Sequence, residues 1–367
     1  MPARYLVTGG AGFIGRYLCA ELLEHGHEVR VLDSFVPQVH GDAADAPPGV
    51  ELLTGDVRDA DLVRRALGGV DGVFHLAAEV GVGQSMYEIA RYVGGNDLAT
   101  AVLLEQISQS QVQRLVVASS MSVYGEGLYR SAEGELFPAV RRVLKEGERA
   151  WDPAGPDGQP LLPVATDETK PVDLASIYAL TKYVQECSSL IIGNAYGVQT
   201  VALRLFNVFG PGQALSNPYT GVLANFGSRL LNGQPPLIFE DGRQKRDFVH
   251  VSDVAKAFHL AMHAAYVSGQ VLNIGSGNAY TIEAVALLLA EAMGRPELRP
   301  QILQKARAGD IRHCFADISR ARDIIGYLPA RRLEASMDEM AEWIAGSQAV
   351  DGGEQARRQL EARGLVV

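Results

Sequence analysis

The first third of the chain alternates short β-branched stretches with segments of helical periodicity, and this alternation constrains the fold more than any other feature. Such a pattern is typical of parallel strands joined by helical crossovers. The sequence therefore predicts an α/β fold with a doubly wound parallel sheet of the Rossmann type. The predicted strands cover residues 4–8, 28–33, 50–53, 72–75, 114–119 and 200–205, and the predicted helices cover 13–25, 59–67, 100–110 and 177–196.

Two changes in this rhythm divide the chain. Residues 126–172 include WDPAGPDGQPLLP, whose prolines and glycines predict an inserted excursion with loops. Beyond residue 210 the elements are shorter, with helices predicted over 221–232, 254–265, 282–293 and 333–345. We therefore expect a Rossmann domain over residues 1–210 that carries the insertion, a smaller C-terminal α/β substrate lobe over 211–345, and a C-terminal tail over 346–367.

Composition and charge exclude several classes of partner. The net charge of −10 argues against nucleic acid, because binding it requires a basic surface. Apolar residues make up 47% of the chain, yet no apolar run approaches the roughly 18 residues of a membrane span, and the N-terminus lacks a secretory pattern. We therefore expect a cytoplasmic protein without membrane contact. The cysteines, Cys19, Cys187 and Cys314, fit neither a disulfide framework nor a metal site, and no metal is predicted.

A glycine-rich turn, TGGAGFIG at residues 8–15, joins the first predicted strand to the first helix. Gly9, Gly12 and Gly15 permit a tight turn and a close approach of the backbone to a pyrophosphate at the helix N-terminus. Asp33 ends the next strand, where its carboxylate can accept from a ribose hydroxyl and would repel a 2′-phosphate. The turn therefore predicts a dinucleotide site that favours NAD over NADP, a preference that the nearby Arg30 weakens.

The stretch SIYALTK at residues 176–182 admits two interpretations. Tyr178 and Lys182 share one face of a helix, because residues four apart are neighbours, so the pair is either part of an ordinary amphipathic helix or a proton-transfer device. A tyrosine base near neutral pH needs its pKa lowered by about three units, or about 4 kcal/mol. An ammonium at about 4 Å supplies on the order of 4 kcal/mol. Beside a dinucleotide site, and with hydroxyls available in SSMSVYG at 119–125, the second interpretation is favoured.

Motifs of one kind run along almost the whole chain: TGGAGFIG at 8–15, GDV at 55–57, HLAA at 75–78, SSMSVYG at 119–125, YALTK at 178–182, LRLFNVFGPGQ at 203–213, RDFVHVSDVA at 246–255 and RAGDIRHCFAD at 307–317. This set resembles the motifs of the extended short-chain dehydrogenases/reductases, and within them the nucleotide-sugar epimerases. GPGQALSNPYTGVLANF at 210–226 and the long insertion resemble, more narrowly, the dTDP-L-rhamnose 4-epimerase type.

This resemblance implies roles for individual residues. Tyr178 is the expected base, Lys182 its partner and a ribose ligand, and Ser120 the hydroxyl that orients the sugar, with Ser122 as a rival for that role. The residues expected at the NAD site are Gly9, Gly12, Phe13, Ile14, Gly15, Asp33, Asp56, Val57, Leu76, Ala77, Ala78, Asn96, Ser119, Tyr178, Lys182 and Phe206. Those expected to contact a nucleotide-diphosphate sugar are Val82, Ser120, Ser122, Tyr178, Asn207, Phe239, Arg246, Arg307, Asp310 and Cys314.

The insertion is a departure from the family pattern, because it lengthens the stretch between the expected serine and tyrosine. Tyr129, Arg130 or Trp151 can cover the sugar, or the insertion can serve an interface, and the sequence does not choose between them. The resemblance also implies a homodimer built on the helices at 100–110 and 177–196, although core packing explains these helices equally well.

The implied reaction is NAD-dependent epimerisation at C4 of a nucleotide sugar through a transient 4-keto intermediate. The sugar expected is a dTDP-6-deoxyhexose such as dTDP-L-rhamnose. A 4,6-dehydratase of this family carries an acidic pair after the serine and a decarboxylase a glutamate two positions after it, but Met121 and Ser122 provide neither. The alternatives are a UDP-sugar 4-epimerase (glucose, glucuronate or N-acetylhexosamine), a nucleotide-sugar dehydratase or reductase, and a non-enzymatic NAD-sensing binding protein.

Overall fold

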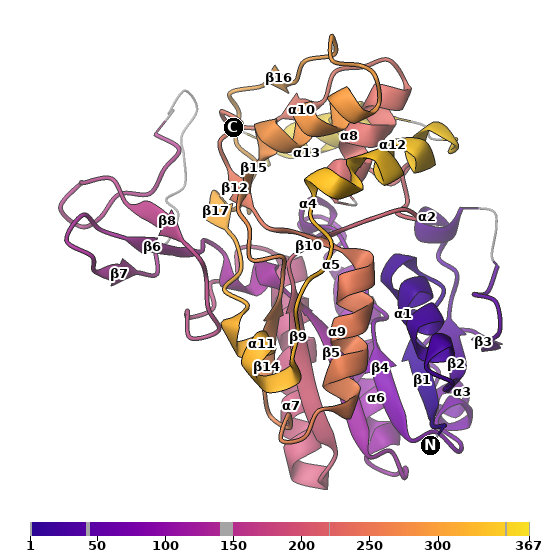
Figure 1. Cartoon of the computed structure of the whole chain (residues 1–367). Coiled ribbons are helices and arrows are strands. Elements are labelled where there is room, and N and C mark those ends of the chain that lie inside the picture. Colours follow the sequence, from indigo (N-terminus) through magenta and orange to yellow (C-terminus); the bar gives the residue numbers. More distant parts are fainter. Residues whose placement is uncertain (1, 42–44, 140–149, 220, 349–350, 367) are drawn as a thin grey trace.

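The computed structural model describes residues 2–41, 45–139, 150–219, 221–348 and 351–366. Its centre is a sheet of seven parallel strands in the spatial order β14-β9-β5-β4-β1-β2-β3 (Figure 1). The predicted doubly wound parallel sheet is therefore confirmed. Its strands are β1 (Arg4–Thr8), β2 (Glu28–Asp33), β3 (Glu51–Thr54), β4 (Gly72–His75), β5 (Arg114–Ser120), β9 (Gln199–Leu205) and β14 (Val271–Ile274).

Helices cover both faces of this sheet. Successive side chains of each strand point to opposite faces, and apolar side chains on both faces must be shielded from water. On β1, Tyr5 and Val7 join one apolar cluster, whereas Leu6 joins the cluster on the other face. Strands buried on both sides need the near-continuous apolar sequence that β1 and β5 show. The first face is covered by α1 (Phe13–Glu24), α9 (Val251–His263) and α11 (Ser319–Ile325), and the second by α3 (Ala60–Ala66), α6 (Ala99–Ile107) and α7 (Ile177–Tyr196).

A smaller lobe lies beyond the carboxyl ends of the strands, where its helices gather above the sheet in Figure 1. Its core packs three helices together: α8 (Val222–Leu231), α10 (Ile282–Ala292) and α12 (Met337–Ala345), the last preceded by η3 (Glu334–Ser336). Short strands complete it: β10 (Asn207–Phe209) beside β13 (Phe248–His250), β11 (Leu237–Ile238) beside β16 (Gln301–Ile302), and β12 (Lys245–Arg246) between β15 (Tyr280–Thr281) and β17 (His313–Cys314).

The large sheet takes residues from both halves of the chain. β14 extends it beside β9, and α9 packs against α1 on its face, although both elements lie beyond residue 210. Without β14 the backbone of β9 would form an open edge. The division into residues 1–210 and 211–345 stays a prediction, and the sheet crosses it.

The insertion forms a small antiparallel sheet at the side of the molecule (Figure 1), made of β6 (Leu128–Arg130) between β7 (Leu136–Phe137) and β8 (Leu162–Val164). A buried arginine of the smaller lobe anchors it. The side chain of Arg312 is 0% exposed and forms ion pairs with Asp152 of the insertion at 2.7 Å, Glu240 at 2.9 Å and Asp241 at 2.6 Å. The described part of the insertion is thus fixed to the lobe, while residues 140–149 lie outside the described ranges.

Residues 346–367, expected to be a tail, contain a packed helix, α13 (Gly353–Glu361). Gln359 Oε1 accepts hydrogen bonds from the hydroxyls of Tyr87 at 3.1 Å and Tyr219 at 3.0 Å, and Asp351 pairs with Arg229 at 2.8 Å. These contacts hold the helix against the rest of the molecule. Across the described ranges, no helix has both the length and the apolar surface that crossing a bilayer requires.

Candidate active site

A cavity of about 750 Å³ lies at the carboxyl ends of the parallel strands, between the sheet and the smaller lobe. Ligand sites of open α/β sheets form at this position. Every residue expected at the NAD or substrate site lines the cavity except Asn96 and Cys314.

The glycine turn forms one end of the cavity, and two of its glycines leave no room for a side chain. Gly9 has φ +70°, and a Cβ there would lie 2.8 Å from the amide nitrogen of Ala77. A Cβ on Gly15 would lie 2.4 Å from the carbonyl oxygen of Gly9. Gly12 stands at the N-cap of α1 and provides no side-chain cap, so the first amide groups and the helix dipole are available to an anion such as a pyrophosphate.

Asp33 lies in the cavity wall at the end of β2. Its carboxylate accepts hydrogen bonds from the backbone amides of Ala11 and Phe35, each at 3.0 Å. His40, the last residue of the short helix α2 (Pro37–His40), places its Nε2 3.4 Å from the same carboxylate. Burial raises the pKa of Asp33, but these hydrogen bonds outweigh it and hold the pKa below its usual value. Arg30 points away and donates to backbone carbonyls at the end of α3. The ionised Asp33 therefore favours ribose hydroxyls over a 2′-phosphate, as NAD requires.

Tyr178 and Ser120 meet at the centre of the cavity wall. Ser176 Oγ caps α7 by accepting from the amide of Ala179 at 3.1 Å, which places Tyr178 in the first turn of that helix. Ser120 ends β5, and Ser122 Oγ donates to Ser120 Oγ at 2.9 Å within the turn η2 (Met121–Tyr124). Burial raises the pKa of the Tyr178 hydroxyl, and its hydrogen bond with Ser120 lowers it. Ser120, rather than its rival, is thus the hydroxyl in contact with the tyrosine.

Lys182 is buried on the same helix, but its ammonium donates to Gln185 Oε1 at 2.7 Å. Burial lowers the pKa of Lys182 to about 7, and the nearby carboxylate of Glu186 opposes this shift. The pKa shift of Tyr178 arises from burial and, in the opposite direction, from the hydrogen bond with Ser120. The ammonium is thus directed one turn further along α7, and the expectation that it lowers the pKa of the tyrosine stays a prediction.

Asn96 lies behind the cavity wall instead of in it. It belongs to η1 (Val93–Leu98), a π-helical turn between α5 (Ile89–Tyr92) and α6, and its side chain is fully buried. Its Oδ1 accepts from the amide of Glu79 at 2.6 Å, and its Nδ2 donates to Thr181 Oγ1 at 2.9 Å. Asn96 therefore ties the loop after β4, which lines the cavity through Leu76–Ala78, to the helix that carries Tyr178.

Two arginines face the other end of the cavity, in the smaller lobe. The guanidinium of Arg307 lies 4.4 Å from the ring centre of Phe239 and pairs with Asp310 at 2.9 Å. Arg246 donates to neighbouring backbone carbonyls, and among the described residues no carboxylate forms an ion pair with it. Its charge therefore remains available to an anionic ligand, and a guanidinium matches the geometry of phosphate.

Three buried amide oxygens in the cavity wall have no hydrogen-bond partner within the part of the chain that is described: Asn207 Oδ1, Gln213 Oε1 and Gln244 Oε1. A buried polar atom without a partner costs about 1–3 kcal/mol. These oxygens therefore indicate a ligand that carries hydroxyl or N–H donors. Asn207 was expected, and Gln213 ends the motif LRLFNVFGPGQ.

Cys314, expected beside the sugar, does not line the cavity. It is 1% exposed and packs in an apolar cluster with Met121 and Phe206, with its Sγ 3.9 Å from Thr166 Oγ1. On the short strand β17 it pairs with Arg246, but its side chain is enclosed by protein. Burial raises the pKa of its thiol to about 12. Cys314 is thus a packing residue behind the site.

The insertion residues proposed as a cover for the sugar also lie elsewhere. Tyr129 is fully buried and donates to Glu126 at 2.8 Å, and Trp151 packs against Ala306. Arg130 is exposed, and none of the three lines the cavity. The interpretation of the insertion as a cover is therefore not supported, whereas its use as an interface stays a prediction.

Sequence reasoning missed four arginines that line the cavity: Arg58, Arg91, Arg229 and Arg357. Arg357 comes from α13, in the segment expected to be a tail. The sequence carries a signal for this helix, because the apolar residues Ala356 and Leu360 stand four residues apart in EQARRQLE. Both are buried in the structure.

Comparison with known proteins agrees with this geometry. Residues 5–275 match the model of the NAD dependent epimerase/dehydratase family. The chain is 36% identical over 352 residues to dTDP-L-rhamnose 4-epimerase from Burkholderia thailandensis, covering 93% of this chain and 95% of the relative.

Two solved structures are similar over almost the whole chain. UDP-glucose 4-epimerase from Thermotoga maritima, with UDP-glucose, has a TM-score of 0.77 at 29% identity over 94% of this chain and 99% of that one. UDP-glucose 4-epimerase from Thermus thermophilus, with NAD, has a TM-score of 0.74 at 31% identity over 94% and 100%. The expected isomerase activity and NAD as cofactor are confirmed, and the chain belongs to the NAD dependent epimerase/dehydratase family.

Proposed function

We propose that this chain inverts C4 of a nucleotide sugar, with a dTDP-6-deoxyhexose such as dTDP-L-rhamnose as substrate. The observation that carries the proposal is the contact between Tyr178 and Ser120 in a cavity with an NAD-type glycine turn at one end and Arg246 at the other. Met121 and Ser122 follow Ser120, so the positions where relatives carry elimination or decarboxylation groups hold no carboxylate.

Different residues of the cavity have different roles in this reaction. The chemistry that bound NAD would supply is the removal of a hydride from the substrate carbon and its return. Gly12, Asp33 and Lys182 would hold the cofactor through its pyrophosphate and riboses. Tyr178 takes the proton of the 4-hydroxyl group as the ketone forms and gives it back on reduction, while Ser120 donates a hydrogen bond to the same oxygen.

Inversion requires the keto sugar to present its opposite face between the two half-reactions. Arg246 supports this rotation of the sugar, because its guanidinium has no carboxylate partner among the described residues. It can therefore hold the diphosphate while the sugar rotates. Asn207, whose buried Oδ1 has no partner among those residues, and Arg307 lie in the same cavity. No further acid or base is needed for the return step.

The choice of sugar rests on similarity. The 36% identity to the Burkholderia thailandensis enzyme supports dTDP-L-rhamnose, while the solved relatives named for UDP-glucose make a UDP-sugar the second candidate. The test is incubation with dTDP-L-rhamnose, dTDP-glucose, UDP-glucose, UDP-glucuronate and UDP-N-acetylglucosamine, followed by NMR of the products. We expect a C4 epimer, formed fastest from dTDP-L-rhamnose.

Other outcomes overturn parts of the proposal. Preference for a UDP-sugar replaces the substrate but keeps the reaction, whereas loss of the C6 hydroxyl or incorporation of solvent deuterium at C5 indicates a dehydratase or related chemistry. Binding of NAD without conversion of any sugar favours a sensing protein. Turnover of the panel in deuterated water should leave C4 free of deuterium, because the hydrogen returns from the cofactor.

We also propose that the chain forms a homodimer through α7. Leu180 and Ile191 lie three turns apart on one face of that helix and are 40% and 66% exposed, so two apolar side chains remain uncovered on that face in the single chain. Light scattering should give twice the 39.4 kDa chain mass, and Ile191→Glu should shift it to one chain. A monomer at micromolar concentration would contradict this assignment.

A further inference from the structure

Four of the eight histidines of the chain lie together on the outer surface, and none of them lines the cavity. His25 and His27 connect the end of α1 to β2, and His259 and His263 lie on the last turns of α9. Ring centres lie 4.0 Å apart for His25 and His259, 4.5 Å for His259 and His263, and 5.2 Å for His27 and His263. The cavity lies at the other end of β1 and β2, so the mechanism does not use this cluster.

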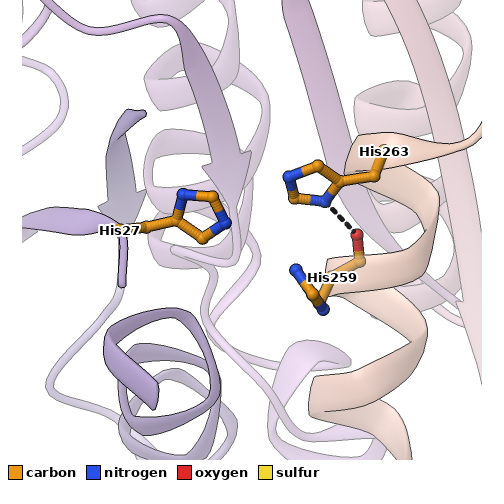
Figure 2. Close-up of side chains that lie close together, drawn as sticks. All are labelled: His27, His259 and His263. Atoms are coloured by element: carbon orange, nitrogen blue, oxygen red, sulfur yellow. Dashed lines mark hydrogen bonds between the residues drawn. The ribbon is translucent and has the colours of Figure 1, made fainter. Parts of the chain in front are cut away.

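His259 and His263 have the spacing at which two helical histidines reach one cation. Figure 2 shows His263 directed toward His259, with its Nδ1 donating to the carbonyl oxygen of His259 at 2.8 Å. That bond leaves the lone pair of His263 on Nε2, which now lies 3.1 Å from the hydroxyl of Tyr5. A metal-bound histidine typically donates its other ring nitrogen to a carbonyl or carboxylate. For His259 the carboxylate is available, because Glu21 Oε1 lies 3.6 Å from its Nδ1.

His27 approaches the pair from the opposite side (Figure 2). One ligand nitrogen from each of His27, His259 and His263 lies within 4.8 Å of the other two. Nitrogens bound tetrahedrally to Zn²⁺ at 2.0–2.1 Å stand about 3.4 Å apart, so closure requires a movement of roughly 1.4 Å. His27 Nδ1 now accepts from the amide of Ala3 at 3.3 Å, a long hydrogen bond that the ring would give up when it turns.

We propose that His27, His259 and His263 form a binding site for one divalent cation of borderline softness, such as Zn²⁺ or Ni²⁺. Imidazole ligands suit these ions, and water completes the coordination because His263 is exposed. The bound ion links the start of β2 to the end of α9, which are far apart in sequence, and thereby favours the folded chain.

A second group, Glu21, His25 and His259, also comes within ligand distance. In that group Glu21 faces Nδ1 of His259 and His25 Nδ1 is engaged with the carbonyl oxygen of Glu21 at 2.8 Å. The geometry favours the first group, because Glu21 there orients His259 instead of competing for the ion.

The test uses the full chain without a histidine tag, freed of metal with EDTA and titrated with ZnCl₂ and with NiCl₂ by calorimetry. We expect saturable binding near one ion per chain and a metal-dependent rise in Tm. His259→Gln and His263→Gln should each weaken binding at least tenfold, and His27→Gln should weaken it less. Lys256→Gln, an exposed position on the same helix, is the matched control and should stay within twofold.

Melting curves and circular dichroism in EDTA establish that each variant folds, and the two helical variants test the proposal independently. The proposal is overturned if the wild-type chain shows no saturable binding, or if His259→Gln and His263→Gln bind like the control. It is equally overturned if His25→Gln removes binding while His263→Gln retains it, because the second group would then hold the ion.

Discussion

Replacing Gly15 by alanine should destabilise the fold by an amount that the structure sets. The added Cβ would lie 2.4 Å from the carbonyl oxygen of Gly9 and 2.6 Å from Cα of Gly10. Ordinary contacts begin at 3.4 Å, so α1 must move about 1 Å away from the turn. Overfilling a packed site costs about 1–3 kcal/mol. We expect Gly15→Ala to lower the free energy of unfolding in urea by that amount.

Gly12→Ala is the matched control within the same turn. Gly12 has φ −71°, and its added Cβ would meet only the carbonyl oxygen of Gly9, at 3.3 Å. Its free energy of unfolding should therefore stay within about 0.5 kcal/mol of wild type. Because this glycine faces the cavity, calorimetry should show NAD binding weakened at least tenfold, or about 1.4 kcal/mol. Equal stability of Gly15→Ala and wild type, or a greater loss in Gly12→Ala, would refute this division of roles.

Three further predictions concern other groups. Tyr178→Phe should lower kcat by at least about 10²-fold while NAD binding stays within twofold, since it removes the proton acceptor alone; more than a tenth of wild-type activity would contradict that role. Burial lowers the pKa of His75 to about 3. In the unfolded chain His75 therefore binds a proton near pH 6.5, whereas in the folded chain it stays neutral. Stability is then lost as the pH falls, by about 2 kcal/mol between pH 6.5 and 5, and His75→Asn should flatten the dependence measured in urea. Arg312→Met should cost about 3 kcal/mol and speed proteolysis of the insertion, because it removes the ion pairs by which a fully buried guanidinium holds Asp152, Glu240 and Asp241 together; an unchanged digestion pattern would contradict the anchoring role.

Elements with local end signals were predictable from the sequence to the residue. Ser176 caps α7 with its side chain, and Gly197 ends the helix in the left-handed region at φ 72°, as these residue types commonly do. The helix expected at 254–265 instead begins at Val251, because the ring of His250 accepts from the amide of Ser252 at 3.2 Å. Histidine is not a usual capping residue, so the sequence carries no clear sign of that start.

In the candidate site too, some residues were placed correctly from local sequence signals and others were not. Gly9 and Asp33 lie at the ends of strands, and the order of parallel strands alone brings such positions to one edge. Asn96 lies behind the cavity wall because it belongs to a π-helical turn. Cys314 is enclosed by an apolar cluster whose residues come from distant segments of the chain. Arg357 reaches the cavity only because α13 folds back on the lobe. Tertiary packing decides these three positions; the pattern in EQARRQLE indicates a helix but not where that helix packs.

The order of synthesis gives the position of β14 a further consequence. β9 emerges from the ribosome well before Val271–Ile274, the strand that covers its outer edge. At about 5–20 residues per second, that edge stays open for roughly 3–13 s. Exposed strand edges pair readily with other chains. We therefore expect the first 210 residues to be prone to aggregation during translation, and slow codons between β9 and β14 should lower the yield of native enzyme.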